Sequence, residues 1–154
     1  LASDCVDDID RAILAHLQQN ARIPNNELAE LVGLSPSPCL RRVRQLEASG
    51  AILGYTALID PEVAGRGYEP IVWVTLNEVT RATMLAFEDA IQDIPDIVEA
   101  ARMMGQPDYL LRIAVASPDA FEELYIDRLA SLPGVKTLTS QHAMKVVKRT
   151  RIVA

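Results

Sequence analysis

The residues whose types and spacing suggest chemistry are concentrated between positions 35 and 45 of this 154-residue sequence. That stretch combines arginines, serines and a glutamine, namely Ser35, Ser37, Arg41, Arg42, Arg44 and Gln45. Guanidinium groups bind phosphates and guanine edges through paired hydrogen bonds, and hydroxyl and amide groups add further donors and acceptors. The set therefore predicts a surface that binds nucleic acid.

A helix is expected to carry these groups, because Ser35 can cap its first turn and proline suits the first helical position. With about 100° of rotation per residue, we centre the buried face on Val43. The inward set is then Pro36, Cys39, Leu40, Val43 and Leu46. The outward set is Ser37, Pro38, Arg41 and Gln45, with Arg42 and Arg44 on the two flanks. We expect Arg41 to reach guanine edges and the flanking arginines to bind phosphates, whereas an ordinary solvated face is the alternative.

The preceding residues supply the elements that must position this helix. Apolar residues at helical spacing predict a first helix from Asp7 or Asp8 to Gln19, and a second that Asn25 or Asn26 can cap. Gly33 ends the second helix in a tight turn. Two helices joined by a short glycine-containing turn, with a third packed across them, are typical of a helix-turn-helix. A three-helix cap without nucleic-acid binding is the alternative.

The second half of the chain alternates strand and helix patterns. Residues 51–59 are apolar and rich in β-formers, which predicts a strand that links the two parts. Further strands are predicted at 71–77, 97–104, 109–116 and 135–147, and helices at 80–93 and 117–132. The order β-α-β-β-α-β is that of a ferredoxin-like sandwich, whose helices cover one face of an antiparallel sheet. Because strand residues such as Ile71 and Trp73 are apolar on the other face as well, we expect a second subunit to cover it.

The predicted class is therefore α+β, with a helix-turn-helix domain at 1–50, a linking strand and loop at 51–67, and a ferredoxin-like domain at 68–154. The formal net charge of −6 excludes binding to DNA through a general positive field, so any contact must be local. The cysteines Cys5 and Cys39 and the histidines His16 and His142 suggest neither a disulfide framework nor a metal or other cofactor. Without an apolar run of about 20 residues or a signal-peptide pattern, we expect a cytoplasmic protein with no membrane partner.

Several short motifs follow one another in a fixed order along the chain. They are Asp7-Asp8-Ile9-Asp10, Asn20-Ala21-Arg22, Glu27-Leu28-Ala29, the run from Val32 to Glu47, Gly54-Tyr55, Gly105-Gln106-Pro107-Asp108-Tyr109 and Leu132-Pro133-Gly134-Val135. In these motifs the sequence resembles the leucine-responsive and asparagine-responsive (Lrp/AsnC, feast/famine) transcriptional regulators over nearly its whole length. The resemblance implies a regulator, not an enzyme, that binds double-stranded DNA and responds to an amino acid or related metabolite. It also implies homodimers that assemble into octamers.

The resemblance places the effector between dimers, at residues 105–109, with 137–142 as a looser facing segment. The implied effector-binding residues are Gly105, Gln106, Asp108, Tyr109, Thr139 and His142. Glycine lets backbone amides approach a carboxylate, and Asp108 can accept from an ammonium group or, alternatively, cap the turn. Gln106 stands where many relatives carry an acid, and Pro107 stiffens the loop, which leaves the identity of the effector open.

An enzyme is the alternative from another class. Sirohaem decarboxylases resemble the same two-part architecture, but they need histidines and arginines that converge on a tetrapyrrole, and this chain has two histidines. A structural adaptor would leave the polar face near Arg41 unexplained, so we favour a regulator. A basic stretch near the C-terminus, with Lys145, Lys148, Arg149 and Arg151, is either a solvated tail or a further DNA contact.

Overall fold

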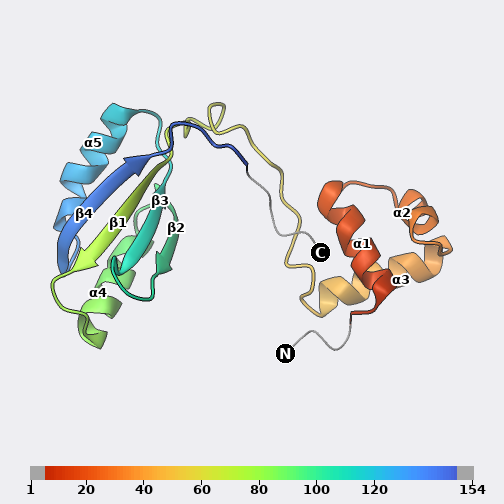
Figure 1. Ribbon diagram of the computed structural model, residues 1–154. Coiled ribbons are helices and arrows are strands. Elements are labelled where there is room, and N and C mark those ends of the chain that lie inside the picture. Colours follow the sequence, from red (N-terminus) through yellow and green to blue (C-terminus); the bar gives the residue numbers. More distant parts are fainter. Residues whose placement is uncertain (1–5, 149–154) are drawn as a thin grey trace. The chain divides into compact units, whose positions relative to one another are not determined.

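The computed structural model describes residues 6–148 (Figure 1). The chain divides into two compact units, and the division falls between Leu58 and Ile59, inside the segment predicted as a linker. Cys5, Arg149 and Arg151 lie outside the described residues, so the predictions about them do too. Among the helices that are described, none has the length and apolar character needed to cross a membrane.

The first unit consists of three helices, α1 (Asp8–Gln19), α2 (Asn25–Leu31) and α3 (Pro36–Ala48). Their shared core is small and apolar, formed by Ile13, Leu28, Ala29, Cys39 and Leu46. The turn between α2 and α3 contains Gly33 at a φ of 70°, where the backbone N–H of Leu34 donates to the Ala29 carbonyl over 2.8 Å. Glycine adopts this left-handed conformation without steric cost, so the turn is as tight as expected. The predicted helix-turn-helix is confirmed.

The second unit is a four-stranded antiparallel sheet with two helices on one face (Figure 1). Its elements are β1 (Pro70–Leu76), α4 (Arg81–Gln92), β2 (Ile97–Arg102), β3 (Tyr109–Ile113), α5 (Pro118–Asp127), a 3-10 turn η2 (Leu129–Ser131) and β4 (Val135–His142). The strand order is β2-β3-β1-β4. Alternate residues of β1 and β3, such as Val72, Val74 and Leu111, are buried with Phe87 of α4. This arrangement confirms the predicted ferredoxin-like sandwich.

The strands predicted at 97–104 and 109–116 exist but end two and three residues early, and two other strand predictions are wrong. Residues 51–59 form no strand with any part of the chain from 6 to 148, and Leu53, Leu58 and Ile59 are exposed there. A strand exists only where another strand takes up its N–H and C=O groups, and β-formers alone do not provide that partner. The last strand also ends at His142 and not at Val147, because β1, its partner, begins at Pro70 opposite His142.

Both ends of the connecting segment are fastened to their own unit. The Tyr55 hydroxyl donates to Oε1 of Glu47 on α3 over 2.9 Å, and burial followed by this carboxylate raises the pKa of Tyr55 to about 12. In the second unit, the Arg66 guanidinium donates to the carbonyls of Pro95 at 3.0 Å and Ala114 at 3.5 Å. The segment is therefore attached to folded structure on each side.

Candidate functional site

The outward surface of α3 carries most of the predicted nucleic-acid contacts. A shallow groove of about 330 Å³ runs along it, lined by Ser37, Leu40, Arg41, Arg44, Gln45 and Ala48. All of these side chains are exposed. Arg41 and Arg44 form no ion pair or hydrogen bond with the described residues, so both guanidinium groups are free to bind a ligand.

The buried side of α3 is rotated from the predicted one. Cys39 and Leu46 are its buried residues, and their positions centre the inner face about 50° from Val43, which is half-buried. Leu40, predicted to face inward, consequently lies on the outer surface with 39% exposure. Pro36 is also exposed, and Pro38, predicted to face outward, is half-buried. The prediction is wrong for these three residues because it took Val43, and not the Cys39 and Leu46 pair, as the centre.

The same rotation brings Arg42 against α1. Its Nη1 atom lies 2.8 Å from a carboxylate oxygen of Asp7 and 2.8 Å from one of Asp10. The Asp10 backbone N–H and then the Arg42 guanidinium hold the pKa of the Asp7 carboxyl below its ordinary value, and the two carboxylates raise the pKa of Arg42. The expectation that Arg42 flanks the outer face ready for phosphate is thus corrected: it is already paired within the protein.

Helix capping differs from expectation at both α2 and α3. Pro24, not an asparagine, occupies the cap position of α2, and Asn25 is its first residue. The Asn25 side-chain amide instead donates to the Pro36 carbonyl over 2.9 Å, which ties the start of α2 to the start of α3. Ser35 occupies the cap position of α3 as predicted, but its side chain makes no capping hydrogen bond. Because it is exposed, its hydroxyl remains able to bind a ligand.

The loop between β2 and β3 contains the predicted effector residues Gly105 and Gln106. Gly105 has a φ of 97°, the Gln106–Pro107 peptide bond is cis, and both Gly105 and Gln106 are exposed. The loop closes where the Met103 N–H donates to the Asp108 carbonyl over 2.8 Å. Gly105 and Gln106 therefore lie on the surface at this end of the sheet, in a turn closed by backbone hydrogen bonding.

Asp108 and Tyr109 are used inside the protein. Asp108 is 8% exposed; its carboxylate accepts from the Leu76 backbone N–H over 2.7 Å, and its backbone N–H donates to the Val74 carbonyl. The Tyr109 ring packs 4.6 Å from the Phe87 ring, and its hydroxyl donates to Glu88. Each side chain thus already has a partner inside the domain, Asp108 on the backbone of β1 and Tyr109 on α4, and their effector contacts stay predictions.

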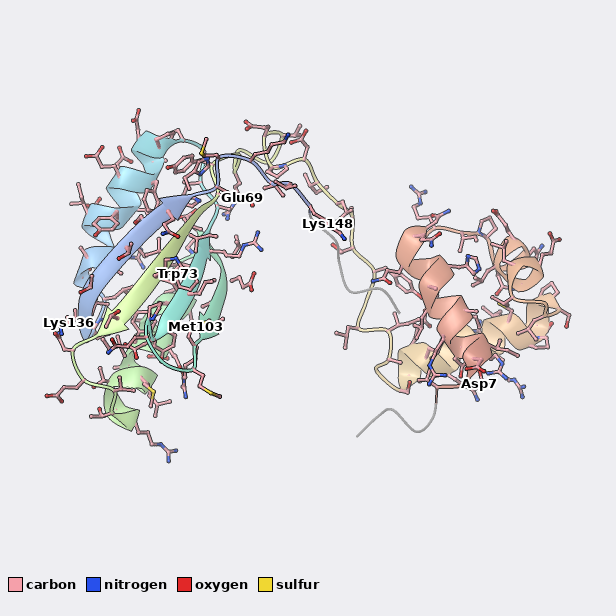
Figure 2. All side chains as sticks on the ribbon, viewed as in Figure 1. Asp7, Glu69, Trp73, Met103, Lys136 and Lys148 are labelled. Carbon is pink, nitrogen blue, oxygen red and sulfur yellow. The ribbon has the colours of Figure 1, made fainter. Side chains whose placement is uncertain are left out.

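Thr139 and His142 do not gather with the loop in a single chain. Thr139 is paired with Trp73 in the middle of the sheet, and His142 is paired with Pro70 at the far end of β1 from Leu76. A strand of this length separates its ends by about 20 Å. Met103, beside the loop, and Glu69, beside Pro70, accordingly lie at opposite ends of the sheet (Figure 2). Because the resemblance places the effector between dimers, the facing segment would come from a neighbouring chain, and this stays a prediction.

No element within residues 6–148 covers the sheet face opposite α4 and α5, which carries Trp73 (Figure 2). The Trp73 indole N–H donates to Oε1 of Gln141 over 3.1 Å. Nearby, Arg112 lies 3.5 Å from a carboxylate oxygen of Glu69 and 3.4 Å from one of Glu99. The face thus combines an aromatic side chain with ion pairs at Arg112, which the apolar strand pattern did not indicate.

Sequence reasoning missed several further features. On the helix side, Glu88 of α4 is paired with Arg102 of β2 and accepts from Tyr109. A second groove of about 570 Å³ beside α5 includes Arg66 and Arg128, whose guanidinium groups already bind backbone carbonyls. No group of three or more His, Cys, Asp or Glu side chains within 6–148 could hold a metal ion. Ion pairs such as that of Glu88 with Arg102 could be expected from opposite charges on different predicted elements, but the sequence does not show which charges meet.

Comparisons with known proteins follow the division of the chain. Residues 6–47 match the AsnC-type helix-turn-helix domain, and residues 69–153 match the Lrp/AsnC ligand binding domain. The leucine-responsive regulatory protein of Escherichia coli K12 is 41% identical over 145 residues, which cover 94% of this chain and 88% of that protein. The protein of the same name from Klebsiella pneumoniae has the same identity and coverage.

Solved structures give the same result. A transcriptional regulator from Neisseria meningitidis in complex with L-methionine superposes with a TM-score of 0.87 at 35% identity, covering 94% of this chain and 93% of that one. An AsnC family regulator from Agrobacterium tumefaciens superposes with a TM-score of 0.88 at 31% identity, covering 96% of each chain.

Proposed function

Because this chain belongs to the Lrp/AsnC family of transcriptional regulators, a DNA-binding family, we propose that the outward row of α3 enters the major groove of its operator. This row consists of the exposed residues Ser35, Ser37, Leu40, Arg41, Arg44 and Gln45. The observation that carries this assignment is the pair of unpartnered arginines, Arg41 and Arg44, beside a groove on the exposed face of the second helix of the motif. In helix-turn-helix proteins this helix supplies the base contacts.

The residues of the row suit different parts of the duplex. Arg41 can bind the O6 and N7 atoms of guanine, and Gln45 can bind adenine through its amide. Leu40 offers an apolar surface for a thymine methyl group. Arg44 lies where it can reach a phosphate, and the hydroxyl groups of Ser35 and Ser37 lie near the start of the helix, where phosphates are commonly bound.

We further propose that two chains associate through the uncovered sheet face around Trp73. At the centre of this face, Leu110 lies directly opposite Trp73, and Ile71 precedes Trp73 by two residues on the same strand. Such an apolar centre is typical of a surface that another subunit covers. A homodimer would present two recognition helices to a pseudo-palindromic site, and assembly of dimers into an octamer would bend or wrap the DNA. A regulator of this kind acts where the chromosome lies, so we place it in the cytoplasm.

An amino acid is the effector class that we propose for the loop around Gly105. The Neisseria meningitidis relative was crystallised with L-methionine, and so was a feast or famine regulatory protein of Mycobacterium tuberculosis. In this chain Gly105 and Gln106 are exposed, and Gly105 has no side chain to hinder the approach of a carboxylate to its backbone. His142 lies opposite Pro70, at the other end of β1 from the loop, so it would join such a site from a neighbouring chain, and we expect the same of Thr139.

Selection of bound duplexes from a random library tests the DNA assignment. The protein is expected to enrich a pseudo-palindromic site and to shift it in a gel, and Arg44→Ala is expected to weaken that shift. If the protein binds selected and unselected duplexes with equal affinity, the proposal of a sequence-specific regulator is contradicted. The same preparation addresses the alternative enzyme, because a sirohaem-type catalyst would bind a coloured tetrapyrrole, whereas we propose no catalytic activity.

Calorimetric titration with a panel of amino acids tests the effector assignment. We expect heat from at least one of them and a changed DNA affinity in its presence, because linkage requires each ligand to alter the binding of the other. Gly105→Val should weaken the response, because a branched side chain is strained at a φ of 97° and hinders the approach of a carboxylate to the backbone, whereas Leu85→Ala, at an exposed position of α4, should leave it intact. Silence across the whole panel with intact DNA binding would refute the amino-acid proposal.

A further inference from the structure

We infer that Arg42 is a positioning residue for DNA recognition, which sets the rotation of α3 through Asp7 and Asp10 without binding DNA itself. This inference rests on the proposed function of the α3 row. It reassigns an arginine of the recognition helix from phosphate binding to a contact inside the protein, and it gives the acidic first turn of α1 a role in reading DNA.

The contact uses the two ends of a single capping box. Oδ1 of Asp7 accepts from the Asp10 backbone N–H over 2.8 Å, and Oδ2 of Asp10 accepts from the Asp7 N–H over 3.3 Å. The other oxygen of each carboxylate accepts from Nη1 of Arg42 over 2.8 Å. Every carboxylate oxygen of the pair therefore has one defined partner. The start of α1 and the middle of α3 are joined by charge-assisted hydrogen bonds that fix direction as well as distance.

Rotation of α3 is the property that this contact can fix. Apolar packing around Cys39 and Leu46 is not directional, so it tolerates small rotations of the helix. A rotation of about 20° would move a side-chain atom about 6 Å from the axis by roughly 2 Å, which breaks hydrogen bonds to base edges. Arg41 is adjacent to Arg42 in the helix, so the group proposed to read guanine is the one most directly aligned by the contact.

The alternative, in which Arg42 leaves the aspartates to bind phosphate, is disfavoured by burial. The Asp10 side chain is 11% exposed and that of Arg42 is 26% exposed. Departure of Arg42 would leave the Asp10 carboxylate buried without its counter-charge, which is costly. Arg41 and Arg44 have no such partner to leave in the described part of the chain. We therefore expect Arg42 to remain paired when the protein is bound to DNA.

Whether Asp10→Asn weakens or strengthens DNA binding tells a positioning role of Arg42 from a phosphate-binding role. Removing an acid from a DNA-binding surface ordinarily strengthens affinity, because repulsion of the phosphates falls. If Arg42 acts through Asp10, however, Asp10→Asn should weaken binding to the selected duplex by about tenfold. Asparagine can still accept in the capping box, so the fold is retained.

Asp7→Asn, at an exposed position where asparagine is a good cap, is a second variant expected to weaken binding. The matched control is Asp8→Asn in the same turn, whose partner is Arg11, and it should stay within about twofold of the parent or bind more tightly.

Salt dependence supplies the second readout. The slope of log affinity against log salt should be unchanged in Arg42→Gln, although its affinity is lower, and should be less steep by about 0.9 in Arg44→Ala. An Arg42→Gln slope that falls as in Arg44→Ala, or tighter binding by Asp10→Asn and Asp7→Asn, would overturn the inference. Failure of Arg44→Ala to change affinity would instead contradict the proposed function of the row, so the two failures are distinguishable.

Discussion

The carboxylate of Asp108 accepts a hydrogen bond of 2.7 Å from the backbone N–H of Leu76. This bond joins the end of β1 to the hairpin of β2 and β3, next to the point where the pairing of β1 with β4 shifts between Thr75 and Leu76. A side chain thus continues the pattern of backbone bonds at a place where strand pairing is irregular. A residue that the family resemblance implies for effector binding thus also holds the sheet together.

Loss of this acceptor is expected to destabilise the C-terminal domain. Asp108→Ala leaves the buried Leu76 N–H unpaired and should lower the free energy of unfolding by about 1–3 kcal/mol, whereas Asp108→Asn keeps an acceptor and should cost less. Urea unfolding followed by circular dichroism measures both. Asp89→Ala, at an exposed position of α4, is the control, with an expected change within about 0.5 kcal/mol. Unchanged stability of Asp108→Ala together with lost effector binding would restore the ligand role.

Substitutions of Arg41 and Arg44, the two unpaired arginines of α3, are expected to change different properties of DNA binding. Arg41→Ala should cost about 1–3 kcal/mol against the preferred base and relax the preference at one position of the operator. Arg44→Ala should weaken all duplexes alike and reduce the salt slope. Library selection repeated with each variant, and titrations at several salt concentrations, give both quantities. Base preference unchanged at every position in Arg41→Ala would show that this residue does not enter the groove as assigned.

Leu40 is expected to detect the methyl group of thymine. Replacing thymine by uracil at the contacted position should weaken the parent protein about fourfold, the equivalent of one buried methyl group at about 0.8 kcal/mol. Leu40→Ala should bind the two duplexes equally. Leu31→Ala, another exposed leucine in the first unit, should still distinguish them. If Leu40→Ala keeps the full difference, the apolar part of the groove contacts something else.

Acid should destabilise the C-terminal domain partly through Glu88. Hydrogen bonds from Arg102 and then from Tyr109 lower the pKa of Glu88 below its ordinary value of 4.5. A lowered folded-state pKa means that this contribution to stability is present above 4.5 and is lost as pH falls through the folded value. Glu88→Gln should therefore lose less stability than the parent between about pH 6 and pH 3. Unfolding by urea across that range tests the difference, and parallel curves for the two proteins would contradict it.

The uncovered sheet face should respond strongly to an added charge. Trp73→Glu places an acid at the centre of the proposed dimer interface and should weaken association by at least about 30-fold, as for a central interface residue. Sedimentation equilibrium measures the change. Leu85→Glu makes a comparable change at an exposed position of α4 and should not alter association. If both variants keep the assembly of the parent, another surface joins the subunits.

The fold follows closely from the sequence because its signals are local. Caps such as Asp7, Thr80 and Ser117 begin their helices where expected, and Gly33 turns the chain as predicted. The errors arise where distant residues decide the outcome. The predicted strand at 51–59 has β-forming residues but no strand partner in the described chain, and Asn25 bonds across to Pro36 in place of capping its own helix.

The site was predictable in composition but not in orientation. A helical projection places Leu40 and Arg42 correctly only if its centre is known, and the centre is set by how α1 and α2 pack on Cys39 and Leu46. In the C-terminal half, family likeness indicates the loop at Gly105 but does not reveal that the neighbouring Asp108 carboxylate is already bound by Leu76.

The three-residue link between Asp7, Asp10 and Arg42 also bears on protein engineering. The orientation of the recognition helix depends on residues of α1, so the helix cannot be transferred alone to another protein. A hybrid that exchanges residues 35–48 alone inherits the donor's base-contacting groups, yet it keeps their angle only if position 42 stays arginine and positions 7 and 10 stay acidic. Redesign of operator preference in this scaffold is therefore a task for two helices at once.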